Sequence, residues 1–145
     1  MIRFSVRLLV ISVILLVSLD TLAQTDDRVM VVVAEGAGNR VIQRNTLRAI
    51  FGMRLRTWPD GRPVRVFVLP NDHPLHIAFC KQILNIYPHQ LRLAWDRLIY
   101  SGTGQAPVVV SSPEEMYQRV VGTPGAVGYL RNGVRESGID VLQIR

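Results

Sequence analysis

The sequence predicts an α/β fold, because stretches with the composition of strands alternate with stretches that have the period of helices. The first strand signal is the run Val-Met-Val-Val-Val-Ala at 29–34, which is apolar throughout and typical of a central strand covered on both faces. A clear helix signal follows at 42–51, where Leu47, Ile50 and Phe51 recur at helical spacing. The same alternation continues to the end of the chain.

Residues 1–23 have the composition of a secretory signal peptide. Two arginines precede an almost unbroken apolar run at 8–19, and Thr-Leu-Ala at its end supplies the small residues that a signal peptidase recognises. The alternative is an uncleaved membrane anchor, but a spanning helix needs about 20 apolar residues, so we expect cleavage. No cysteine follows the run directly, which excludes a lipoprotein. The sequence therefore predicts one periplasmic domain at 24–145.

The charge of the mature domain is positive and comes almost entirely from arginine. Two arginines and one aspartate leave with the leader, so 15 of 17 cationic and 10 of 11 acidic residues remain, a net charge of +5. Guanidinium groups bind carboxylates and phosphates through paired hydrogen bonds, so this bias favours oxyanion ligands or acidic partners. A solvated surface encoded by a GC-rich genome is the simpler explanation and is favoured over a specific ligand. Nucleic acid is not expected, since no basic cluster is interleaved with aromatic residues.

Turn signals surround the first helix. Glu-Gly-Ala-Gly-Asn at 35–39 matches a phosphate-binding loop only weakly and is better explained as a turn between strand and helix. Gly52 offers an end to the helix, and Arg54 follows it. Trp58 precedes Pro-Asp-Gly, in which proline fixes φ and glycine supplies a positive φ. We therefore expect the indole to close one end of the core.

A polar loop between a strand at 63–69 and the next helix is the best candidate for a binding site. Pro74 suits the first turn of a helix that runs to about Ile86, and Asn71 or Asp72 is its expected N-cap. In α/β folds such a loop binds anions, because free N–H groups and the helix dipole converge there. The candidate ligand-binding residues are Asn71, Asp72, His73, His76, Arg54, Ser101 and Thr103.

Two other interpretations of this loop stay open. The loop could serve only as a cap, with both histidines exposed to solvent. A metal site built from Asp72, His73 and His76 is disfavoured, because the spacing of the histidines is loose and the sequence signals no further ligand. Ser101 and Thr103 belong to a Gly-rich loop that is followed by a strand and not by a helix, so at most we expect them to contact the ligand.

Cys80 is the one cysteine of the chain, so no internal disulfide and no thiolate metal cluster can form. Its apolar neighbours predict a buried, inert thiol. No Ser/His/Asp arrangement and no pair of acids in an apolar setting is signalled. The sequence therefore predicts no catalytic residues, no metal and no cofactor.

The second half of the chain continues the alternation. A Ser-Pro-Glu-Glu capping box starts one of its helices, and two glycines within a strand indicate close approach of another part of the chain. In order, we expect a helix at 89–100 with Trp95 in the core, a strand at 108–110, a helix at 113–121, a strand at 123–130, a hairpin-like loop at 131–138 and a strand at 139–144.

Four signals in this order resemble the phosphate-binding proteins of ABC transporters, which are type II periplasmic solute-binding proteins. They are Ile50-Phe51 at a helix end with Trp58 in the next turn, a polar loop opening a helix that holds Phe79, a helix that carries Trp95, and a Gly-Ala-Val-Gly-Tyr strand at 125–129. The resemblance covers nearly all of 24–145. It implies a single lobe of that fold, with a mixed, mostly parallel sheet flanked by helices.

The resemblance does not carry over the phosphate ligands. In the family, the loop before the helix supplies an Arg and Ser-Gly-Thr, and full-length members clamp the anion between two lobes. In register with Phe79, this sequence has Leu69 and His73-Pro74-Leu75 at those positions. The guanidinium and the hydroxyl groups are therefore absent, and the helix N-terminus with the residues around it is what remains.

From these observations we expect an exported, non-enzymatic solute-binding-like protein that takes a small, phosphate-like oxyanion at a helix N-terminus. The implied partner is a membrane transporter or a sensor protein. The alternative is a periplasmic protein-interaction or sensor-accessory module that has lost phosphate binding. A homodimer across the face that the second lobe covers in the relatives also stays open.

Overall fold

The computed structural model describes residues 26–37, 41–134 and 137–145. The predicted signal peptide and the end of the predicted 35–39 turn lie outside these residues. Within the described part of the chain, no helix is both long and apolar enough to cross a bilayer.

Strands and helices alternate as the sequence predicts. The elements are β1 (Val29–Ala34), β2 (Val41–Ile42), α2 (Arg44–Phe51), β3 (Arg65–Val68), α3 (Pro74–Phe79), the π-helical turn η1 (Cys80–Leu84), α4 (Pro88–Tyr100), β4 (Val108–Val109), α5 (Pro113–Gly122), β5 (Ala126–Arg131) and β6 (Ile139–Ile144). Two boundaries differ clearly from the prediction, and one of them is the start of the strand expected at 123–130, which begins at Ala126. The helix expected at 42–51 begins at Arg44, because Val41 and Ile42 pair with β6 as a short edge strand.

The described strands form one mixed, mostly parallel sheet in the order β2-β6-β1-β5-β3-β4. β1 pairs antiparallel with both β5 and β6, whereas β3 is parallel to β4 and β5, and β2 is parallel to β6. β1 therefore runs against the other strands of the sheet. Its central residues Val31 and Val32 have no exposed surface, which confirms the prediction of a strand covered on both faces.

The prediction that 131–138 forms a hairpin-like loop is wrong. β5 and β6 run in the same direction with β1 between them, so a tight turn cannot join them. Near the start of β6, Ser137 lies beside α5, where Tyr117 donates a hydrogen bond to its carbonyl at 2.7 Å. The backbone of Gly138 then accepts from the Glu35 N–H at 3.0 Å.

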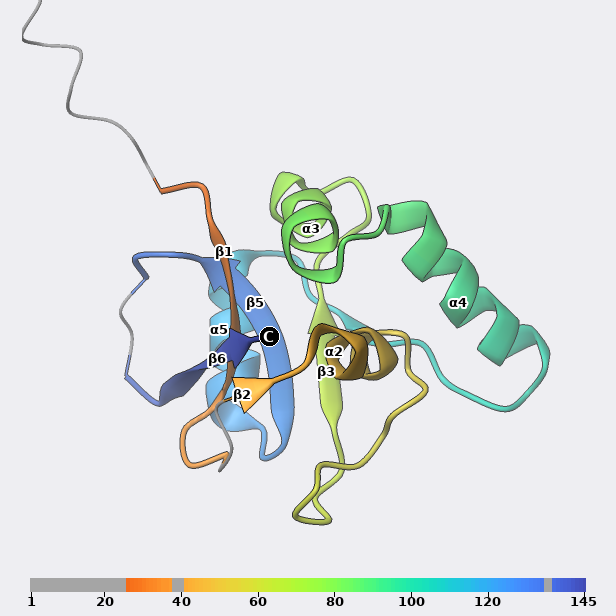
Figure 1. Cartoon of the computed structure of the whole chain (residues 1–145), viewed down its shortest axis with the longest axis horizontal. Helices are drawn as coiled ribbons and strands as arrows, with labels where there is room; N and C mark the ends of the chain where they lie inside the picture. Colours follow the sequence, from red (N-terminus) through yellow and green to blue (C-terminus); the bar gives the residue numbers. More distant parts are fainter. Residues whose placement is uncertain (1–25, 38–40, 135–136) are drawn as a thin grey trace, which may run out of the picture.

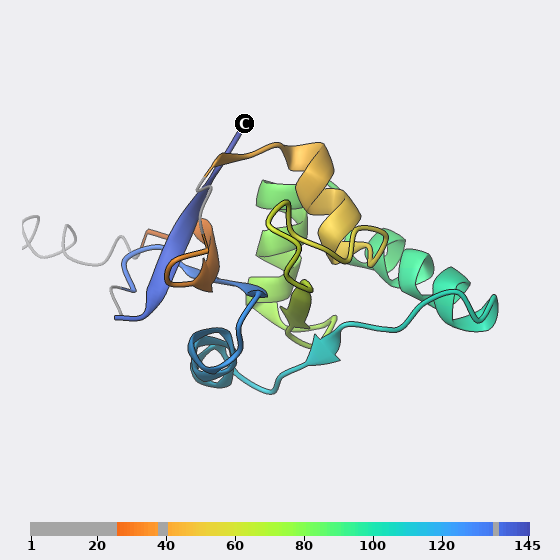
Figure 2. The ribbon, with the colours of Figure 1, turned by 90° about the horizontal axis from the view of Figure 1, so that it is seen from below.

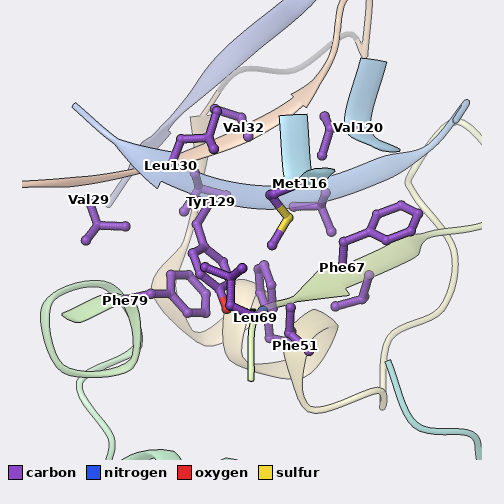
Figure 3. Close-up of a cluster of buried hydrophobic side chains, with 14 of the residues drawn as sticks. Val29, Val32, Phe51, Phe67, Leu69, Phe79, Met116, Val120, Tyr129 and Leu130 are labelled. Atoms are coloured by element: carbon purple, nitrogen blue, oxygen red, sulfur yellow. Dashed lines mark hydrogen bonds between the residues drawn. The ribbon is translucent and has the colours of Figure 1, made fainter. Parts of the chain in front are cut away.

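Helices cover both faces of the sheet. α5 lies on one face and α2 and α3 lie on the other, while α4 projects to one side of the molecule (Figures 1 and 2). Figure 3 shows the core that results, with Phe51, Phe79 and Tyr129 grouped on one side of β5 and Val120 on the other. The Tyr129 ring stacks on that of Phe79 with centroids 3.9 Å apart and an angle of 6°.

Both tryptophans hold segments together through their indole N–H groups. Trp95 of α4 is buried and donates to the carbonyl of Phe51 at 2.7 Å, which attaches α4 to the end of α2. Trp58 donates to the carbonyl of Gly125 at 2.9 Å and packs against the core while staying half-buried. The expectation that Trp58 closes one end of the core is therefore met only in part.

The start of α5 follows the prediction with one change. The hydroxyl of Ser112 accepts from the Glu115 N–H at 3.1 Å, as a capping box requires. The carboxylate of Glu115, however, accepts from the N–H and hydroxyl of Ser111 and not from Ser112. These hydrogen bonds lower the pKa of Glu115, and its role is to cap the helix.

Candidate functional site

The loop at 70–73 leads from β3 into α3, and its last residue caps the helix. Nδ1 of His73 accepts from the Leu75 N–H at 3.1 Å, so the N-cap is His73 and the prediction of Asn71 or Asp72 is wrong. Pro74 has no N–H to offer, and the Leu75 N–H is already bonded. Two of the backbone positions that would bind an anion at a helix start are therefore not available while His73 caps the helix.

His76 lies inside the core, so the interpretation that both histidines are exposed to solvent is wrong for this residue. Its Nδ1 is 2.5 Å from the hydroxyl of Tyr129. That hydroxyl accepts from the Leu69 N–H at 2.8 Å, which leaves its own proton available for donation to Nδ1. In the tautomer that accepts this proton, Nε2 of His76 carries the N–H, and it lies 3.6 Å from the Cys80 thiol.

Burial determines the protonation states in this cluster. It lowers the pKa of His76 to about 4, with a smaller electrostatic contribution from nearby His73. It raises the pKa of Cys80 to about 12 and that of Tyr129 above its usual value. The cluster is therefore neutral at neutral pH. The cluster packs beneath the 70–73 loop on its core side. The buried thiol confirms the prediction for Cys80.

Two hollows lie beside the loop. We call the first the α4–β4 pocket, which has a volume of about 370 Å³ and is lined by Val68, Leu69, Pro70, Asn71, Arg92, Trp95, Asp96, Ile99, Ala106, Pro107 and Val109. We call the second the α3–α4 hollow, which is more open and is lined by Asn71, Asp72, Ile77, Lys81, Tyr87, Pro88, His89, Arg92 and Leu93. Asn71 and Arg92 belong to both, so these two side chains mark the border between them.

The border residues have unused hydrogen-bonding groups. Nε of Arg92 donates to the Asp96 carboxylate at 3.1 Å, and its Nη atoms have no partner in the described part of the chain. The side-chain amide of Asn71 makes no hydrogen bond to any described residue. Because an exposed i,i+4 ion pair contributes only about 0.3–0.5 kcal/mol, Asp96 does not lock the Arg92 guanidinium in place. These groups can therefore bind a ligand.

A second cation, Lys81, lines the α3–α4 hollow together with Arg92. Nζ of Lys81 lies 5.8 Å from the centroid of the Tyr87 ring, and that ring stacks on His89. Asp72 is an exposed carboxylate in the same lining. The hollow therefore combines positive groups with one acid. Among the described residues, no three His, Cys, Asp or Glu side chains come together in a way that could hold a metal ion.

The other predicted site residues lie elsewhere. Arg54 lines a shallow surface hollow with Asn45, Thr46, Ala49 and Leu55. Ser101 and Thr103 follow the C-terminal end of α4, where their hydroxyls are 2.7 Å apart and the Thr103 carbonyl accepts from Arg56 at 2.6 Å. Asn71, Asp72 and His73 thus stay together on one loop, whereas Arg54, Ser101 and Thr103 do not line either hollow beside it.

Sequence reasoning missed Arg92 and Tyr129. Arg92 precedes the buried Trp95 by about one turn, so its position near the same face of the helix was the available signal. Tyr129 was noted only as the end of the Gly-Ala-Val-Gly-Tyr strand, and nothing local indicates which residue its hydroxyl meets.

A larger hollow of about 750 Å³ lies beside Trp58 and is lined by Ile42, Ile50 and Leu55 among others. It also includes Ala37 and Val41, which flank the segment 38–40 outside the described residues.

No protein-family model and no curated protein sequence matches the chain. Solved structures do match it. An ABC-type phosphate transport receptor from Vibrio cholerae aligns with a TM-score of 0.62 and 14% identity, over 80% of this chain and 45% of the receptor. PstS from Borrelia burgdorferi aligns with a TM-score of 0.61 and 17% identity, over 81% of this chain and 47% of PstS.

These matches confirm the predicted fold. The chain has a single-lobe form of the type II periplasmic-binding-protein-like fold, and it spans less than half the length of the structures it matches. At this identity the likeness concerns the fold. This likeness does not assign the ligand or the partners of those proteins to this chain.

Proposed function

We propose that the chain is an exported, non-enzymatic solute-binding lobe that binds a small oxyanion beside Asn71 and Arg92 and works with a membrane transporter. The observation that carries this proposal is the pair of unused donors at the border of the two hollows. A guanidinium with free Nη atoms is the group that binds carboxylates and phosphates through paired hydrogen bonds. The amide of Asn71 adds a donor from the loop.

The fold supports the same class of function. The structures it resembles are a phosphate transport receptor and PstS, and export agrees with the signal peptide that the sequence predicts. The start of α3 contributes less to anion binding than the sequence predicts, because the Leu75 N–H already donates to His73. We therefore assign the main charge to Arg92 and expect weak binding, with a Kd on the order of a millimolar, or about −4 kcal/mol.

Titration calorimetry and ligand-observed NMR with phosphate, sulfate and acetate at low ionic strength test the proposal. We expect at least one of these anions to bind, and Arg92→Gln to weaken its binding about tenfold or more. Arg97→Gln is the matched control, because Arg97 is an exposed arginine of the same helix that lines neither hollow. Equal binding by both variants, or no binding to the unaltered protein, would contradict the assignment.

A second candidate function is a protein-interaction module, and one observation favours it. α4 and the residue before it expose large apolar side chains, with Tyr87 at 58%, Leu93 at 51% and Tyr100 at 89% exposure. Such a surface suits contact with a partner protein. Crosslinking in the periplasm with a photoreactive residue at position 100 tests it: recovery of one membrane protein supports this function, and no specific adduct opposes it. A homodimer or a sensor partner has no support from the matched structures.

A further inference from the structure

We propose that the oxyanion is the head group of a small monocarboxylate with an apolar tail, and that the tail lies in the α4–β4 pocket. This inference rests on the function proposed above and specifies its ligand. Three features of the pocket carry it: an apolar interior, an arrangement of polar groups along α4, and two exposed apolar side chains at its rim.

The interior of the pocket is apolar and firmly held. Leu69 and Trp95 line it and are almost fully buried, at 1% and 5% exposure. The Trp95 indole is fixed by its hydrogen bond to the Phe51 carbonyl at 2.7 Å. The volume of about 370 Å³ lies within the range of small-molecule sites, which are mostly apolar with a few placed polar groups. A preformed surface of this kind suits a hydrocarbon tail.

Four side chains of α4 line the pocket. Arg92 comes first, Trp95 and Asp96 follow about one turn later, and Ile99 almost one turn after Asp96. At the rise of an α-helix, Arg92 and Ile99 are roughly 10 Å apart along the axis. A carboxylate bound at the Nη atoms of Arg92 would therefore place a short alkyl tail against Trp95 and Ile99, while Nε keeps its bond to Asp96.

Ile99 and Val109 stand at the rim with 45% and 60% exposure. Val109 belongs to β4, an edge strand of the described sheet, and the two side chains approach the pocket from different elements. A bound tail that contacts these exposed apolar side chains would displace water from them, which is favourable. A tail there would cover surface that is otherwise costly to leave in water.

Inorganic phosphate fits the same pocket less well. The polar side chains of the lining are Asn71, Arg92 and Asp96, so no hydroxyl side chain is present and one carboxylate already faces the guanidinium. A second negative charge on the ligand would meet Asp96, and a phosphate ion cannot use the apolar interior. A monocarboxylate carries one charge and gains roughly three- to fourfold in affinity for each methylene that it buries.

A homologous series of ligands tests this inference on the full protein. We expect calorimetry or ligand-observed NMR to give affinities that rise from acetate through butyrate to hexanoate by about three- to fourfold per methylene, with phosphate weaker than hexanoate. Val109→Ser should lower the affinity for hexanoate several-fold and leave acetate unchanged. Val108→Ser is the matched control, since Val108 precedes Val109 in β4, is 51% exposed and does not line the pocket.

The outcomes separate the two proposals. If neither acetate, hexanoate nor phosphate binds, the proposed function and this inference fail together. If phosphate or acetate binds as tightly as hexanoate, or Val109→Ser acts like Val108→Ser, the inference fails and the proposed function stands. Hexanoate binding that Arg92→Gln leaves unchanged overturns the head-group assignment. Ile99→Ser provides a second pocket variant in case Val109→Ser does not fold, with circular dichroism as the check.

Discussion

The hydroxyl of Tyr129 lies 2.5 Å from Nδ1 of His76 within the core. This contact joins the Gly-Ala-Val-Gly-Tyr strand to the helix that follows the candidate binding loop. The same hydroxyl accepts from the Leu69 N–H at 2.8 Å, so one phenol holds both the end of β3 and the first turns of α3. The loop at 70–73 is therefore anchored on both sides by a neutral, buried cluster.

The burial of His76 makes the protein sensitive to acid. The pKa of His76 is lowered to about 4 in the folded state from an ordinary value of 6.5. Between these pH values the unfolded chain binds a proton that the folded chain does not, so stability is full above about pH 6.5 and falls as the pH drops toward 4. The shift corresponds to a loss on the order of 3 kcal/mol. Urea denaturation from pH 7.5 to 4 measures it.

Carboxylates also titrate in the lower part of this range, so the comparison requires two variants. His76→Gln removes the titrating group and should flatten the decline between pH 6.5 and 4, although its stability at pH 7 is lower because a buried network is altered. His89→Gln changes an exposed imidazole and should keep the decline. An equal pH dependence in all three proteins would show that His76 is not the titrating group.

The thiol of Cys80 should be unreactive in the folded protein. It has no exposed surface, and burial raises its pKa to about 12, so almost no thiolate is present at neutral pH. With a thiol reagent at pH 8, we expect no reaction in buffer and rapid reaction in denaturant. In a Ser101→Cys variant the added, exposed thiol serves as an internal control and should react at once. Rapid reaction of both thiols under native conditions would contradict the buried position.

Gly125 should tolerate a methyl group far less well than Gly61. Both have a positive φ, +74° and +89°, so alanine at either site costs about 1–2 kcal/mol of backbone strain. At Gly125 a Cβ atom would also clash with the Pro63 carbonyl oxygen, whereas at Gly61 it meets nothing within 4 Å. Gly125→Ala should therefore lose roughly 1–3 kcal/mol more than Gly61→Ala in chemical denaturation. Equal losses of unfolding free energy in the two variants would show that the backbone at Pro63 moves aside without destabilising the protein.

Much of the fold was predictable, because the apolar periodicity of the sequence matches the positions that are buried in the structure. The apolar run at 29–34 became a strand with both faces covered, and Leu47, Ile50 and Phe51 became the buried face of α2. The reversed direction of β1 and its position between β5 and β6 were not predictable from these patterns. Strand pairing depends on contacts between distant residues, so the sequence order of neighbouring strands suggested a hairpin that does not form.

The candidate site was predicted less completely than the fold. The loop at 70–73 was recognised from its turn residues, but Arg92 comes from another helix, and only the packing of α4 brings it to Asn71. His76 could have been placed correctly, because it precedes the apolar Phe79 and Cys80 by three and four residues and so shares their helix face. Its polar side chain suggested exposure, whereas the hydroxyl of Tyr129 makes burial tolerable.

The central claim is that a small oxyanion binds at the border of the two hollows, and amide and side-chain NMR during an anion titration tests it most directly. With acetate, hexanoate and phosphate as probes, we expect saturable shifts of the Asn71 side-chain amide, the Arg92 Nε–H and the backbone of 70–73. The signals around Trp58, beside the larger hollow, should stay unchanged. Shifts confined to the Trp58 hollow, or no saturable shifts with any of these anions, would contradict the claim.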